Sequence, residues 1–224
     1  MGINLPFMQK QVIALILKDL QVDWRNKYPV AGLLLYIVVL VIIAYLSFAN
    51  FILPEVWNAL FWIILLFTSV NAIAKSFIQE DDRSMYYFFT AKPIAIILGK
   101  LIYHFIYQLA LVLVAYFFFS LFLGAATGNL GLFTLNLLVG SVGLSSAFTL
   151  ISALASKTNN QSIMMAILGF PVIIPVLILA ITNSKMIILG GGWADISINF
   201  ITLISVNMII IALTFILFPF TWKS

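Results

Sequence analysis

The chain has 224 residues, of which 64% are hydrophobic and 8% charged. Soluble globular domains are roughly 25% charged, so this composition cannot cover a surface that faces water and indicates an integral membrane protein. The absence of cysteine excludes disulfides, thiolate catalysis and cysteine-ligated metals. The net charge of +4 does not indicate nucleic-acid binding, because the basic residues follow the pattern of membrane loops.

Six apolar segments are long enough to cross a bilayer, which requires roughly 20 residues of helix. They lie at residues 30–49, 56–74, 101–124, 130–155, 162–182 and 199–220. The apolar runs are continuous and lack the alternation of a lipid-facing barrel strand. The sequence therefore predicts an all-α bundle of six transmembrane helices, with residues 30–224 forming one transmembrane domain.

The basic residues orient this bundle. All of the 11 except Lys185 lie before the first span, between spans two and three, between spans four and five, or at the carboxyl end. Positive charge is retained on the cytoplasmic side of membranes, so both termini are expected in the cytoplasm. Trp24 and Trp222 would then lie near the cytoplasmic interface.

Residues 1–29 do not resemble a cleavable signal, because Lys10, Lys18 and Asp19 interrupt their apolar run. Apolar and polar residues alternate here with helical spacing, which predicts an amphipathic helix along the inner membrane face. Two interpretations stay open. The helix either anchors the bundle, or it is an elbow helix that receives a cytoplasmic partner.

The loop at residues 75–100 is the only long internal one, and it is a candidate docking segment. It contains Glu80, Asp81, Asp82 and Arg83, then an aromatic run that includes Tyr86, and finally Lys92 and Pro93. Pro93 fits the first turn of the third spanning helix. A short in-plane helix before it would transmit force to spans two and three, whereas the alternative is a solvated turn with weak local ion pairs.

Two polar residues lie one turn apart in the third span, His104 and Gln108. A neutral histidine there could ligate haem iron or another metal. The simpler interpretation is a hydrogen bond to a lipid headgroup, to water or to Gln108. The chain contains no second histidine, so we predict no metal site.

Two further spans carry features of helix packing and bending. Small residues in span four allow close helix approach and hydroxyl hydrogen bonds between helices: Gly140, Ser141, Gly143 and Ser145. Asn71 and Asn207 could likewise join helices. Span five contains Gly169, Pro171 and Pro175, which predict either a hinge or a fixed kink.

Catalytic motifs are absent from the sequence. It contains no GxxxxGK[ST], HExxH or GxSxG, so we expect neither ATP hydrolysis by a Walker site nor protease activity. We therefore expect a non-catalytic membrane subunit.

Two stretches resemble the haem exporter protein B (CcmB) family. The first runs from residues 77–83 through Pro93 to Gly99 and Lys100, and the second is the sequence GFPVIIPVLILA at residues 169–180. The order of a basic amphipathic amino terminus, six spans, a charged loop after span two and a proline-broken fifth span is also similar to this family. The resemblance covers almost the whole chain.

This resemblance implies the permease subunit of an ABC-type complex in the bacterial inner membrane that matures c-type cytochromes. A separate cytoplasmic ATPase, the A subunit, would bind ATP and dock on the inner face. The C and D membrane subunits and the periplasmic haem chaperone E would be further partners, beside membrane lipids and a second copy of this chain. ATP-driven movement would either export haem or release the haem-loaded chaperone.

Other functions stay open at this point. The chain could serve an ABC exporter of polysaccharide, lipid or drug, since such subunits share an elbow helix and an inner coupling loop. It could also be a membrane scaffold without an ATPase. A secondary transporter is a weaker alternative, because the two halves of the chain show no inverted repeat.

Overall fold

The computed structural model describes residues 5–25, 27–48, 52–73, 93–125, 128–156, 158 and 160–223. Within them the chain is helical and contains no strand. Its helices are α1 (Leu5–Arg25), α2 (Lys27–Phe48), α3 (Pro54–Ile73), α5 (Pro93–Leu123), α6 (Leu130–Ala155), α7 (Gln161–Ile188) and α8 (Trp193–Lys223). Each helix from α2 onward is long and apolar enough to cross a membrane, and each corresponds to one predicted span. The prediction of an all-α membrane bundle is confirmed.

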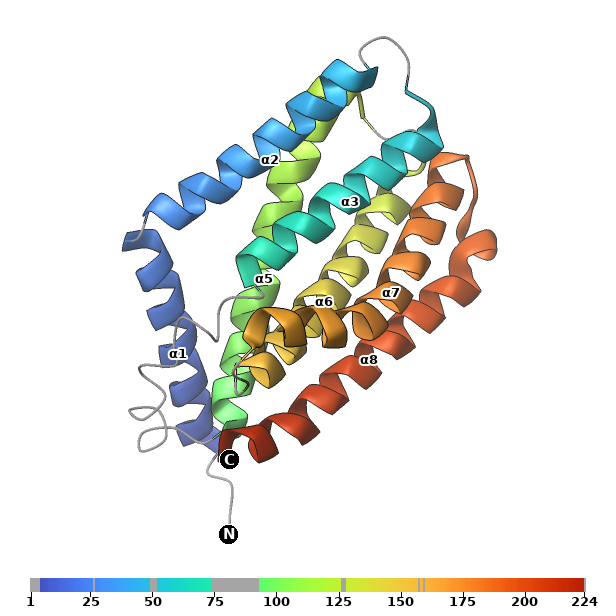
Figure 1. The fold of residues 1–224 in the computed structure, drawn as a ribbon. Coiled ribbons are helices and arrows are strands. Elements are labelled where there is room, and N and C mark those ends of the chain that lie inside the picture. Colours follow the sequence, from blue (N-terminus) through green and yellow to red (C-terminus); the bar gives the residue numbers. More distant parts are fainter. Residues whose placement is uncertain are drawn as a thin grey trace.

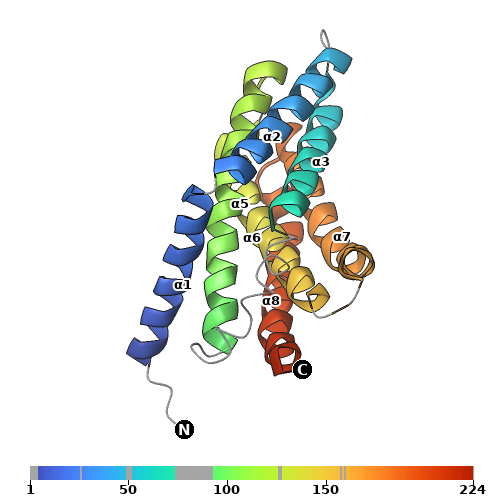
Figure 2. The same cartoon turned by 60° about the vertical axis from the view of Figure 1, so that its left-hand side comes forward.

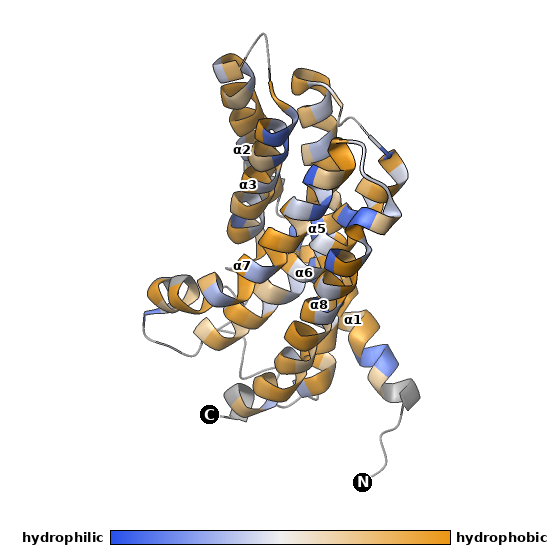
Figure 3. Ribbon diagram, turned by 90° about the vertical axis from the view of Figure 1, so that its right-hand side faces the viewer, coloured by the Kyte–Doolittle hydropathy of each residue, from blue (hydrophilic) through white to orange (hydrophobic). Residues whose placement is uncertain are grey.

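The bundle is built around α6, which packs against α3, α5, α7 and α8 (Figure 1). Hydrophobic residues run along most of every long helix, as expected for helices that face lipid or one another (Figure 3). α1 lies alongside the first half of α5 in both views of the fold (Figures 1 and 2). The start of α1 and the end of α8 lie at the same end of the bundle.

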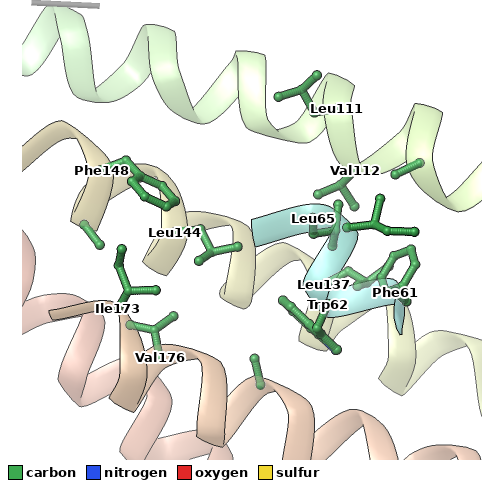
Figure 4. Close-up of a cluster of buried hydrophobic side chains, with 14 of the residues drawn as sticks. Phe61, Trp62, Leu65, Leu111, Val112, Leu137, Leu144, Phe148, Ile173 and Val176 are labelled. Atoms are coloured by element: carbon green, nitrogen blue, oxygen red, sulfur yellow. The ribbon is translucent and has the colours of Figure 1, made fainter. Parts of the chain in front are cut away.

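The apolar core fills the space between α3, α5, α6 and α7 (Figure 4). Phe61 and Trp62 from α3 are fully buried in it. Trp57 stacks on Phe61 with ring centroids 5.4 Å apart and meets Phe119 of α5 edge-on at 4.9 Å. Such aromatic pairs fix helix positions in a bilayer, where burial from lipid supplies no hydrophobic driving force.

Short turns connect α5, α6 and α7. Asn129 caps α6, because its Oδ1 accepts hydrogen bonds from the backbone amides of Gly131 and Leu132 at 3.0 and 3.2 Å. Gly128 has a φ of +107°, and a Cβ there would lie 2.2 Å from the carbonyl oxygen of Ile187. Only glycine therefore allows the turn before α6 to pass this close to the end of α7.

Helix α7 is bent. Its first part runs across the direction of the remainder and extends away from the bundle (Figures 1, 2 and 3). Pro171 and Pro175 lie inside the helix, where each removes a backbone hydrogen-bond donor. Gly169 is buried close by, 3.7 Å from Ile151 of α6 when a Cβ is built on it. Whether this bend is a hinge or a fixed kink stays a prediction.

Candidate functional site

The predicted docking segment falls largely outside the described residues. Residues 74–92 include Glu80, Asp81, Asp82, Arg83, Tyr86 and Lys92. The described chain resumes at Pro93, which is the first residue of α5 and is half-buried. Proline is well suited to that position, because the first helical residue has no intrahelical partner for an N–H group. The described part of the structure next to this segment is therefore the start of α5.

The first half of α5 is joined to α1 by charged groups. Lys100 Nζ lies 3.1 Å from Asp19 Oδ2, and both residues are buried, at 6% and 7% exposure. Lys18 Nζ lies 2.8 Å from the other carboxylate oxygen of Asp19. A buried ion pair is costly to break from one side, because the remaining charge stays desolvated.

A second polar link lies one helical turn further along. The hydroxyl of Tyr103 on α5 donates a hydrogen bond to Asp23 on α1. The ammonium of Lys100 also lies 5.8 Å from the centre of the Tyr103 ring. We call these four residues, Asp19, Asp23, Lys100 and Tyr103, the α1–α5 polar contact. The two helices approach closely beside it, since a Cβ on Gly99 would lie 3.3 Å from Leu15 Cβ.

Sequence reasoning missed the α1–α5 polar contact, although the sequence contains a signal for it. Asp19 and Asp23 are four residues apart on one amphipathic helix, and Lys100 and Tyr103 are three residues apart on another. Each pair therefore lies on one face of its helix. Two helix faces with complementary charged and hydroxyl groups favour packing against each other. The sequence alone does not show which two helices pack together.

His104 and Gln108 lie deep between helices. His104 is 1% exposed, and its Nδ1 lies 2.8 Å from Thr149 Oγ1 of α6. The Thr149 hydroxyl donates to the Ser145 carbonyl at 2.6 Å, which leaves its oxygen able to accept from the His104 tautomer that carries a proton on Nδ1. Gln108 is fully buried, and its amide has no hydrogen-bond partner among the described residues. Thr149 is therefore one partner of His104, and a hydrogen bond to a headgroup, to water or to Gln108 stays a prediction.

The described residues contain no group of three His, Asp or Glu side chains that could hold a metal ion. The role of His104 in the structure is to link α5 to α6.

The four small residues predicted to pack in span four, Gly140, Ser141, Gly143 and Ser145, are all buried in α6. A Cβ on Gly140 would lie 2.6 Å from Trp62 Cη2, and one on Gly143 would lie 2.5 Å from Asn207 Oδ1. Ser141 and Ser145 donate to the carbonyls of Leu137 and Val142 on their own helix, so they do not link helices through hydroxyl donation. The glycines, in contrast, admit large or polar side chains from α3 and α8.

The two intramembrane asparagines also differ. Asn207 Nδ2 donates to the Val139 carbonyl at 2.9 Å and so connects α8 to α6. Asn71 is exposed and donates to Phe67 on its own helix. Only Asn207 of this pair therefore connects two helices in the described structure.

A second polar cluster, the Ser184 cluster, joins α3, α6 and α7. Ser184 Oγ accepts from Trp62 Nε1 at 2.8 Å and donates to Asn58 Oδ1 at 2.7 Å. Asn58 Nδ2 donates to the Ile181 carbonyl at 2.9 Å, and Asn136 Nδ2 of α6 donates to the Ala180 carbonyl at 2.9 Å. All four of its side chains, from Asn58, Trp62, Asn136 and Ser184, are at most 1% exposed.

The Ser184 cluster was also missed from the sequence. The sequence does show polar side chains inside apolar spans. Such side chains indicate interhelical hydrogen bonds, because a polar group in lipid needs a partner on another helix. The sequence does not reveal that these particular residues converge.

Comparison with known proteins identifies the family. The family model described as CcmB protein matches residues 10–222, which includes both polar clusters and the undescribed loop between α3 and α5. No curated protein and no solved structure matches the chain. Proteins of this family are membrane permease subunits, not themselves catalytic, of an ABC complex for haem export in cytochrome c maturation. With six membrane-length helices and a match over nearly its whole length, this multi-pass membrane protein belongs to the CcmB family.

Proposed function

We propose that this chain couples ATP hydrolysis by a separate ATPase subunit to haem export or to release of a haem-loaded periplasmic chaperone. The ATPase docks on the cytoplasmic loop that ends at Pro93, chiefly through Glu80, Asp81, Asp82 and Arg83, with Tyr86 and Lys92 at its end. ATP binds to the partner subunit, and haem is cargo rather than a cofactor held by this chain.

The observation that carries this proposal is the way in which α5 is joined to its neighbours. α5 is one continuous helix of 31 residues that begins at Pro93, directly after the charged loop. Its first half is linked to α1 through Asp19 and Lys100, and to α6 through His104 and Thr149. A displacement of the loop is therefore transmitted along a rigid element into the centre of the bundle.

The bend in α7 supports a moving part on the same side of the bundle. Pro171 and Pro175 leave carbonyl groups without intrahelical donors, so the first part of α7 is held less firmly to its own helix. We propose that this part rearranges when the ATPase subunits close. Two copies of this chain would match two ATPase subunits by symmetry, beside the C and D subunits in the bacterial inner membrane.

Neutralising the acidic loop tests ATPase docking. The ATPase should no longer co-purify from native membranes with the variant Glu80→Gln/Asp81→Asn/Asp82→Asn. A cationic surface on the ATPase would lose its acidic partners in the loop. The measurement is mass spectrometry of the subunits retained by the tagged protein, together with the ATPase activity of the eluate.

The matched control removes acidic residues at the opposite end of the bundle. Glu55 and Asp195 lie in the first turns of α3 and α8. The variant Glu55→Gln/Asp195→Asn should retain the ATPase at the level of the unmodified protein. Equal recovery of ATPase by the loop variant and by this control would refute docking through the acidic residues.

A further inference from the structure

Helix α1 has a second face, which no other helix among the described residues covers. Away from the side that contacts α5 lie Ile13, Leu17, Leu20 and Trp24, which are 56%, 51%, 38% and 84% exposed. Their spacing of three and four residues places them in one row along the helix. This row is apolar, although α1 is not among the helices long and apolar enough to span a membrane.

The charges of α1 are divided between these two sides. Asp19 and Asp23 face α5, where they pair with Lys100 and Tyr103. Lys10 and Arg25 are exposed. On a helical wheel both cations lie on the same flank of the apolar row. The outward face is therefore cationic, even though the helix as a whole carries almost as many acidic as basic residues.

We propose that this outward face of α1 binds anionic phospholipids of the adjacent leaflet. The apolar row inserts among the upper acyl chains, while Lys10 and Arg25 contact the acidic headgroups. The α1–α5 polar contact gives the face its selectivity, because it withdraws both carboxylates from the lipid side.

Two observations favour lipid over a protein as the occupant. The first is charge complementarity between the two exposed cations and anionic headgroups. The second is continuity with the outer surface of the bundle, because α1 leads directly into α2, a spanning helix whose Leu35 and Leu46 are largely exposed (Figure 1). The attraction of one basic side chain to an anionic membrane surface corresponds to about a fivefold preference for anionic over neutral lipid beside it.

The experiment uses Trp24 as the reporter. The full-length protein is placed in nanodiscs that contain either brominated phosphatidylglycerol or brominated phosphatidylcholine at the same mole fraction. Subtracting the emission of a Trp24→Phe variant isolates the signal of Trp24. We expect brominated phosphatidylglycerol to quench that signal at least about twofold more than brominated phosphatidylcholine, and the excess to fall as salt is added.

Charge variants identify the cause. Lys10→Gln/Arg25→Gln should abolish the excess quenching, whereas the charge-conserving Lys10→Arg/Arg25→Lys should keep it. Lys185→Gln removes an exposed cation at the other end of the bundle and should also keep it. Equal quenching by the two lipids, or an excess that survives Lys10→Gln/Arg25→Gln, would overturn the proposal. So would absence of quenching by either lipid, since a protein would then cover the face.

Discussion

Replacing Gly140 with alanine tests how closely α3 and α6 must approach. The added Cβ would lie 2.6 Å from Trp62 Cη2, whereas ordinary contacts begin near 3.4 Å. Trp62 is 1% exposed and is tied to Ser184 through its indole nitrogen, so the ring has no free direction in which to move. Either the helices separate by about 0.8 Å or the indole hydrogen bond breaks.

Overpacking of this kind costs about 1 to 3 kcal/mol, and a lost interhelical hydrogen bond adds about 0.6 kcal/mol. Alanine recovers up to about 1 kcal/mol through its greater helix propensity. We therefore expect Gly140→Ala to lower the free energy of unfolding by about 2 kcal/mol. The assay is unfolding of the purified protein in mixed micelles by increasing mole fraction of sodium dodecyl sulfate.

The control is Gly32→Ala on α2, where an added Cβ would meet nothing within 4 Å. That variant should be unchanged or slightly more stable. A double variant with Trp62→Phe should lose less stability than the two single variants together, because the smaller ring vacates the space that Cβ needs. If Gly140→Ala is as stable as Gly32→Ala, the close approach of Trp62 to α6 is wrong.

Three further variants test other parts of the bundle. Ser184→Ala removes a hydroxyl that both accepts and donates across helices, so it should lower unfolding free energy by about 1 to 2 kcal/mol in the same assay; no loss would contradict the Ser184 cluster. Lys100→Gln removes the buried ammonium beside Asp19 and leaves it paired with the partly exposed Lys18, so it should cost up to about 3 kcal/mol, while adding Asp19→Asn should restore part of that loss; a double variant that is less stable than Lys100→Gln would contradict the pairing. Pro171→Ala/Pro175→Ala should straighten α7, and the separation between spin labels in its first and last turns should then increase toward the roughly 40 Å of a straight 28-residue helix. An unchanged separation in this double variant would show that the prolines do not cause the bend.

The six spanning helices were predictable because hydrophobic length alone specifies them. The residues at which these helices end were less predictable. The fifth span was expected to end at residue 182, where Asn183, Ser184 and Lys185 begin a polar run. The helix continues to Ile188, because Asn183 and Ser184 are buried and the Ser184 hydroxyl finds partners on α3. A polar residue such as Ser184 can therefore lie inside a spanning helix when another helix provides its hydrogen-bond partner.

The third span has a charged residue near its start. Its helix was expected to have Pro93 in its first turn, and α5 does begin at Pro93, eight residues before the predicted span at residue 101, so that Lys100 lies inside the helix. Lys100 is buried within the helix because Asp19 of α1 neutralises its charge. Sequence hydropathy treats each residue alone, so it cannot anticipate that two charged residues from different helices bury each other.

Helix α6 has polar links to three other helices, and this limits which helices can move together. α6 is linked to α5 through Thr149, to α7 through Asn136 and to α8 through Val139. α1 is linked instead to α5, through buried charges. Movement that enters at the start of α5 must therefore carry α1 with it or break a desolvated ion pair, which is costly. The first part of α7, which precedes Pro171 and Pro175, extends away from this connected group, and we propose that it is the segment that changes its angle at the lowest cost.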